Sequence, residues 1–115
     1  AMLDYYVERL EAEMPGRYAI FGHIGDAHVH VNMLPETQAD FDTGLPLTVE
    51  FARQAVALGG TVSAEHGLGR KKRDLLPIEF TGAQIDAMRD VKRRLDPQWL
   101  LGRGILFDDN VNIGQ

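Results

Sequence analysis

The residues that could do chemistry are concentrated in two short stretches of the chain. Residues 22–32 read Gly-His-Ile-Gly-Asp-Ala-His-Val-His-Val-Asn, and residues 63–67 read Ser-Ala-Glu-His-Gly. All four histidines of the sequence lie inside these two stretches. Imidazole is the commonest side-chain ligand of metals in proteins and a frequent general base near neutral pH. The two stretches are therefore candidates for a metal site or a catalytic site.

The first stretch predicts a β-hairpin over residues 18–34, because polar and apolar residues alternate on both sides of a Gly-Asp-Ala turn. With Asp26 and Ala27 as the two loop residues, His23 lies opposite His30. Alternation then gives one face with Phe21, His23, His28, His30 and Asn32, and an opposite apolar face with Ile20, Gly22, Ile24, Val29, Val31 and Met33. Opposed Cβ atoms are about 4.5–5.5 Å apart, so two imidazoles would reach one ion at about 2.0–2.1 Å.

The second stretch supplies a carboxylate and a fourth imidazole. Residues 61–63 predict a short strand after Gly59 and Gly60, and adjacent residues on an extended backbone point to opposite sides. Glu65 and His66 are therefore expected to have different roles. Two imidazoles and one carboxylate leave an open coordination position, as catalytic metal sites do, and His66 would remain as a general base. The alternatives are a hydrated sheet face and a surface Glu-His pair in a glycine-rich turn.

Three helices are expected to position these stretches. Apolar spacing predicts helices over residues 2–14, from about Pro46 to Gly59, and over residues 81–95, where Thr81 and Gln84 form a capping-box pattern. Their expected inward residues are Leu3, Val7, Leu10 and Met14; Leu47, Phe51, Ala55 and Leu58; and Ile85, Met88, Val91 and Leu95. The element order predicts an α+β fold, a ferredoxin-like α/β sandwich with helices on one face of an antiparallel sheet. Such a fold has a further strand before the first helix, so we expect an incomplete fragment.

Composition limits the function classes. The chain has 115 residues, a net charge of −5 and no cysteine. The acidic balance argues against nucleic acid as a partner, and the lack of cysteine excludes disulfides and thiolate metal sites. No apolar run approaches the 18 or so residues of a membrane span. We expect a cytoplasmic protein, or one peripheral to a membrane.

Three segments of the chain resemble a known family. Residues 22–32, residues 60–69 and the Asp96-Pro97 pair are similar to the C-terminal cap domain of FAD-linked oxidases of the vanillyl-alcohol oxidase type. The nearest group is the D-2-hydroxyacid dehydrogenases, which include D-lactate dehydrogenase, the glycolate oxidase FAD subunit and D-2-hydroxyglutarate dehydrogenase. The resemblance extends from about Arg17 to Phe107. It implies that residues 1–115 are the C-terminal part of a cap domain that binds substrate and metal, without the FAD-binding domain.

The resemblance also implies roles for individual residues. It assigns His23, His30 and Glu65 as ligands of a divalent metal, His66 as the acceptor of the hydroxyl proton, and Asn32 as a neighbour of the substrate. The sequence departs from the family pattern at two places. Ala27-His28 stands where Gly-Asn is usual, which adds a further imidazole nitrogen, and residues 102–105 read Gly-Arg-Gly-Ile in place of Asn-Pro-Gly-Lys.

The expected function is that of a FAD-dependent D-2-hydroxyacid dehydrogenase or oxidase. FAD would be bound mainly by the missing N-terminal domain, and the nitrogen and oxygen ligands suit Zn²⁺, Mn²⁺ or Fe²⁺ better than Mg²⁺ or Ca²⁺. The expected partners are a small 2-hydroxyacid, the FAD domain of the same polypeptide and a second copy of the chain. The isolated fragment is expected to be inactive.

Three other functions remain open from the sequence. The same ligands would serve a metal-dependent hydrolase, and the fold would serve a ligand-binding or oligomerisation module or a structural cap without chemistry. The basic run at residues 70–73 is either a solvated loop or a surface that attracts anionic substrate or docks on the flavin domain.

Overall fold

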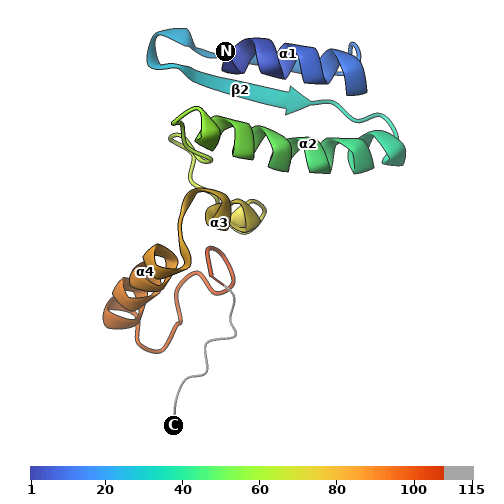
Figure 1. The fold of residues 1–115 in the computed structure, drawn as a ribbon. Helices are drawn as coiled ribbons and strands as arrows, with labels where there is room; N and C mark the ends of the chain where they lie inside the picture. The colour runs from blue at the N-terminus through green and yellow to red at the C-terminus, as the bar shows by residue number, and fades with distance from the viewer. Residues whose placement is uncertain (108–115) are drawn as a thin grey trace. The chain divides into compact units, whose positions relative to one another are not determined.

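The computed structural model of the chain describes residues 1–107. Its contacts divide the chain into two units, Ala1–Gly60 and Thr61–Gln115, and each unit is described by itself (Figure 1). The first unit holds α1 (Met2–Glu13), β1 (Tyr18–His23), the 3₁₀ turn η1 (Ile24–Asp26), β2 (His28–Met33) and α2 (Gln38–Ala57). The second holds the 3₁₀ turn η2 (Arg73–Leu75), α3 (Leu76–Glu79) and α4 (Gly82–Leu95).

Helix α1 forms where the sequence predicted it and ends before Pro15 and Gly16, where Gly16 has a φ of 69°. Leu10 and Met14 are fully buried. Leu3 and Val7, expected on the inner face, are 41% and 40% exposed. The inner face is rotated because the rings of Tyr5 and Tyr6 pack edge-on against Phe51 of α2. A helix with large residues on several sides permits more than one buried stripe, and packing against α2 decides between them.

The hairpin forms, but its register differs from the predicted one by two residues. His23 pairs with His28, Phe21 with His30 and Ala19 with Asn32. The loop contains four residues, because Ile24–Asp26 form a 3₁₀ turn and Ala27 closes it in the left-handed region at a φ of 52°. A shift of two residues preserves the side-chain alternation, so both predicted faces are correct except at Ile24, which lies in the turn and is 84% exposed.

The apolar face of the hairpin packs against both helices of the first unit. Leu10 and Met14 of α1 form a buried cluster with Leu47 and Phe51 of α2. The strand residues in contact with this cluster are Tyr18, Ile20, Val31 and Met33. Figure 1 shows α1, β2 and α2 running alongside one another. The predicted α+β class, with helices on one face of an antiparallel sheet, is confirmed.

Helix α2 begins eight residues earlier than predicted, so Pro46 lies inside it instead of at its start. Thr37 and Asp40 form a capping box, in which the Thr37 hydroxyl accepts from the Asp40 N–H and the Asp40 carboxylate accepts from the Thr37 N–H. Arg17 also pairs with Asp40 at 2.5 Å. Two capping bonds and a tertiary ion pair therefore offset the hydrogen bond that Pro46 lacks. At the other end of α2, Leu58 is 51% exposed, and the prediction that it is buried is wrong.

The expected third strand at residues 61–63 is absent, and the sheet within residues 1–107 has two strands. This segment instead forms bends that lead into the turn carrying Glu65 and His66. The 3₁₀ turn η2 and the short helix α3 lie between residue 72 and Thr81, where the sequence patterns predict no helix.

Helix α4 is capped as predicted, with the Thr81 hydroxyl accepting from the Gln84 N–H and the Gln84 side chain accepting from the Thr81 N–H. Ile85 of α4 is buried in a second apolar cluster, whose other members are Leu76, Trp99 and Phe107. Val91 and Leu95 are 57% and 81% exposed, so the prediction that they face inward is wrong.

Asp96 terminates α4. Its carboxylate accepts from the N–H groups of Leu100 and Leu101 at 3.0 and 2.9 Å and pairs with Lys92. The bond from Lys92, followed by the backbone donors, lowers the pKa of Asp96 to about 2. Among residues 1–107, no helix has the length and apolar content that a membrane crossing requires.

Candidate metal and catalytic site

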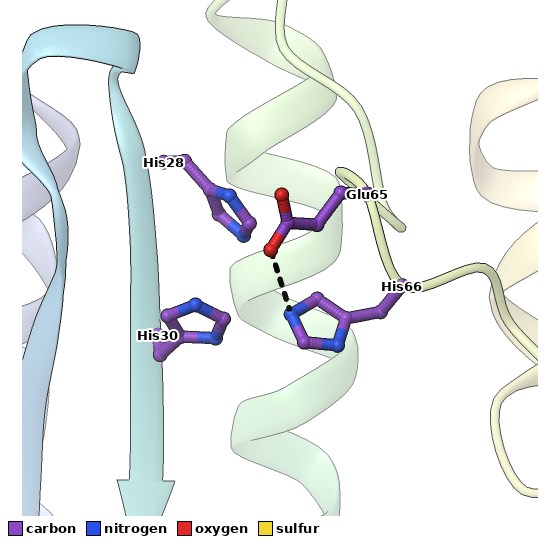
Figure 2. A group of neighbouring side chains, drawn as sticks. All are labelled: His28, His30, Glu65 and His66. Atoms are coloured by element: carbon purple, nitrogen blue, oxygen red, sulfur yellow. Dashed lines mark ion pairs between the residues drawn. The ribbon is translucent and has the colours of Figure 1, made fainter.

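The polar face of the hairpin carries three of the four histidines. His28 and His30 are two residues apart on β2, so their side chains project from the same face (Figure 2). Their ring centroids are 4.5 Å apart, and one ring nitrogen of each lies within 4.8 Å of the other. Two nitrogens on one tetrahedral ion would be about 3.4 Å apart. Small side-chain rotations would therefore bring this pair to ligand spacing.

His23 lies across from His28 in the observed register, instead of across from His30. Its ring centroid is 5.9 Å from that of His28 and 6.4 Å from that of His30. The three imidazoles share one face, as the alternation predicted. The shifted register places His28, the residue at which this sequence departs from the family pattern, opposite His23, and places His30 opposite Phe21.

Gly22 permits the close approach of the two strands beside His28. Its φ is 154°, and a Cβ built there would lie 2.2 Å from the His28 carbonyl oxygen and 3.0 Å from the Val29 Cα. Any residue with a side chain would push β2 away. Strand alternation places Gly22 on the apolar face without a further role, and only the strand pairing shows why a glycine is needed there.

Phe21 is a second residue of the site region to which no role was assigned. It lies directly opposite His30, and the two rings stack with centroids 5.1 Å apart and planes inclined by 21°. Phe21 is 55% exposed. The predicted substrate neighbour Asn32 continues the same row of β2, is exposed, and pairs with Ala19.

In the second unit, Glu65 and His66 lie in a turn. The Ser63 carbonyl accepts from the His66 N–H at 3.0 Å, and Ala64 is left-handed at a φ of 44°. This curvature brings the Glu65 carboxylate to 3.7 Å from Nε2 of His66 (Figure 2). The expectation that the two side chains point to opposite sides is wrong, because it assumed an extended backbone.

The segment before this turn is held by Glu79 at the end of α3. One carboxylate oxygen of Glu79 accepts from the Thr61 hydroxyl and from the Val62 N–H, both at 2.9 Å. The Thr61 hydroxyl in turn accepts from the Ser63 N–H at 3.4 Å. No sequence motif indicated this contact, because Glu79 is 18 residues from Thr61.

Two members of the basic run have structural contacts. Arg70 donates to the Arg103 carbonyl at 3.1 Å, and Arg73 donates to the Gly104 carbonyl at 3.3 Å. Lys71 and Lys72 are exposed. The two arginines thus tie this loop to residues 103–104, which stand where the family pattern has Pro-Gly.

Comparison with known proteins agrees with these motifs. The family described as FAD linked oxidases, C-terminal domain, matches residues 1–106. The chain belongs to this family. The family places it beside FAD-linked enzymes and confirms the resemblance that the two histidine-containing stretches indicated.

Among its relatives is a D-2-hydroxyglutarate dehydrogenase of Xanthomonas citri, which is 40% identical over 92 residues, 76% of this chain and 20% of that protein. The mitochondrial D-lactate dehydrogenase [cytochrome] 1 of Saccharomyces cerevisiae is 32% identical over 82% of this chain and 16% of its own length. Glycolate oxidase subunit GlcD of Bacillus subtilis is 32% identical over 76% and 19%. The chain thus spans about a fifth of the length of these relatives. No solved structure matches it.

Proposed function

We propose that this chain is the C-terminal part of a FAD-dependent dehydrogenase or oxidase that converts a D-2-hydroxyacid to a 2-oxoacid. The observation that carries the proposal is the row of imidazoles on one hairpin face, together with the Glu65–His66 turn, in a member of the FAD-linked oxidase family. The names of the relatives favour D-2-hydroxyglutarate, D-lactate or glycolate as the substrate class.

The proposed metal ligands are His23, His30 and Glu65. Neutral imidazole nitrogens and one carboxylate oxygen fit Zn²⁺, Mn²⁺ or Fe²⁺, and this chain itself contributes no thiolate. His28 offers a further imidazole nitrogen, and its ring centroid is 4.5 Å from that of His30, compared with 6.4 Å for His23. A bound divalent ion would supply Lewis-acid polarisation of the substrate hydroxyl and carboxylate.

The proposed general base is His66. Its neutral imidazole would accept the hydroxyl proton of the substrate while the α-carbon gives up hydride. The Glu65 carboxylate lies 3.7 Å from Nε2 of this imidazole. Asn32, exposed at the end of the histidine row, would donate its amide N–H to a substrate oxygen.

FAD would accept the hydride when bound, and we assign no residue of this chain to holding it. The other proposed partners are the FAD domain of the same polypeptide and a second copy of the chain. A cytoplasmic location, or one peripheral to a membrane, stays part of the proposal.

Calorimetric titration of zinc into the 115-residue chain tests the ligands. We expect His23→Ala, His30→Ala and Glu65→Gln each to weaken zinc binding by about tenfold or more, because each removes a side chain that coordinates the ion directly. His66→Ala serves as the control, because a general base that is not a ligand leaves affinity near that of the wild type.

His28→Ala distinguishes the two candidate imidazoles. If His28→Ala abolishes binding while His23→Ala has no effect, the second imidazole is His28 and the assignment of His23 is wrong. If no variant changes the affinity, the metal site itself is refuted. For the whole polypeptide, dye reduction that requires a D-2-hydroxyacid would support the activity, and an enzyme inert towards all such acids would refute it.

A further inference from the structure

The turn that carries Glu65 and His66 has no regular secondary structure to hold it. Residues 61–70 contain bends and turns, and three of them, Ala64, Gly67 and Gly69, adopt positive φ values of 44°, 68° and 60°. Non-glycine residues in the left-handed region persist where surrounding contacts over-determine the backbone. A fixed geometry for Glu65 and His66 therefore requires an anchor outside the turn.

The contacts of Glu79 supply such an anchor. Its carboxylate accepts the Thr61 hydroxyl and the Val62 N–H on the same oxygen, each at 2.9 Å. The Thr61 hydroxyl also accepts a hydrogen bond from the Ser63 N–H. The Ser63 carbonyl in turn accepts one from the His66 N–H at 3.0 Å. A continuous chain of hydrogen bonds thus runs from the end of α3 to the backbone of His66.

The place of Glu79 suits a residue that positions the Glu65–His66 turn better than one that stabilises helix α3. Glu79 is the last residue of α3, where a negative charge gains nothing from the helix dipole. Hydrogen bonds to a charged acceptor are stronger than neutral ones, and a bond to a main-chain N–H restrains the backbone itself. Because both donors meet a single oxygen, a glutamine carbonyl at this position would accept both as well.

We infer that Glu79 is a positioning residue that fixes the Glu65–His66 turn for metal binding and proton transfer. The inference rests on the proposed function for its consequence and on the three side-chain contacts at Thr61, Val62 and Ser63 for its mechanism. Glu79 lies outside both sequence motifs and on a different element from the turn, and it would act on Glu65 and His66 only through the backbone that it holds.

The test compares Glu79→Ala with Glu79→Gln in the 115-residue chain, with Glu8→Ala on the exposed face of α1 as a control for the loss of one negative charge. We expect Glu79→Ala to speed amide hydrogen exchange at Val62 and His66 by about tenfold or more, because the local opening free energy falls. It should also weaken zinc binding by about tenfold, since one ligand is no longer held in place. Glu79→Gln and Glu8→Ala should remain near the wild type in both measurements.

A urea titration of Trp99 fluorescence separates positioning from a general effect on the second unit, because the only tryptophan of the sequence lies there. Faster exchange and weaker zinc binding with an unchanged unfolding midpoint support the inference. An unaltered Val62 amide in Glu79→Ala, or a Glu79→Gln variant as impaired as Glu79→Ala, overturns it. If the wild type binds no zinc, the metal proposal fails, while the exchange measurement still decides whether Glu79 anchors the turn.

Discussion

Replacement of Gly22 by alanine should damage the hairpin at the point where the histidines are carried. The added Cβ would lie 2.2 Å from the His28 carbonyl oxygen and 3.0 Å from the Val29 Cα. Both neighbours are backbone atoms of β2, which cannot rotate away as a flexible side chain would. Ordinary contact between carbon and oxygen needs more than 3 Å, so β2 must move by about 1 Å at His28.

The expected cost has two parts. A non-glycine residue at a φ of 154° carries backbone strain of about 1–3 kcal/mol. Forcing an extra carbon into a packed contact adds about 1–3 kcal/mol. We therefore expect the free energy of unfolding to fall by about 2–6 kcal/mol, a large share of the total of about 5–15 kcal/mol typical of small proteins.

The matched control is Gly25→Ala in the same hairpin loop. A Cβ at Gly25 would meet no atom within 4 Å, and Gly25 does not have a positive φ. We expect the free energy of unfolding of this variant to lie within about 0.5 kcal/mol of the wild type.

Urea unfolding followed by near-ultraviolet circular dichroism of tyrosine reports on the first unit, since all three tyrosines lie there. Zinc titration of both variants then tests the site, and Gly22→Ala should bind more weakly because the strand that carries His28 and His30 is displaced. If Gly22→Ala is as stable as Gly25→Ala, the close approach of the strands at Gly22 does not exist, and our explanation of this glycine is wrong.

Three further predictions concern stability. Leu10→Ala should lower the free energy of unfolding by about 2–5 kcal/mol in urea titrations, because Leu10 of α1 is fully buried in a cluster with residues of α2 and the sheet; a loss below about 1 kcal/mol would contradict that packing. Ala27→Gly should raise the free energy of unfolding by up to about 1 kcal/mol, since it relieves a left-handed alanine at a φ of 52°; a loss of stability would show that the turn tolerates alanine without strain. The pKa of Asp96 is lowered from 3.8 to about 2, chiefly by Lys92, so its stabilising contribution is complete above pH 3.8 and is lost as the pH falls towards 2. Between these pH values, the free energy of unfolding followed by Trp99 fluorescence should therefore depend less on pH in Asp96→Asn than in the wild type. An unchanged pH dependence would exclude Asp96 as its source.

Local pattern was enough to predict the two faces of the hairpin, α1 and α4. Side chains alternate with a period of two along a strand, so the histidines share a face whichever even register the strands adopt. Two capping residues three positions apart, Thr81 and Gln84, fix the start of α4 in the same local way. The family motif could likewise be identified from the sequence alone, because it lies in two short uninterrupted stretches.

The tertiary structure decided the details on which the site geometry depends. The register depends on how the loop closes, and left-handed Ala27 closes it over four residues instead of two, which places His28 opposite His23. The start of α2 depends on the capping pair Thr37 and Asp40 and on the ion pair of Asp40 with Arg17. Together these place the start of the helix before Pro46, which by itself favoured a start at residue 46.

The turn at Glu65 and His66 is the part of the candidate site that sequence patterns describe least. Its shape comes from Ala64 in the left-handed region and from Glu79, whose carboxylate reaches residues 17 and 18 positions earlier in the chain. Periodicity and capping rules describe interactions over a few residues. A contact between distant residues is determined only when the chain has folded, and in this protein such a contact holds the segment that leads to the proposed base.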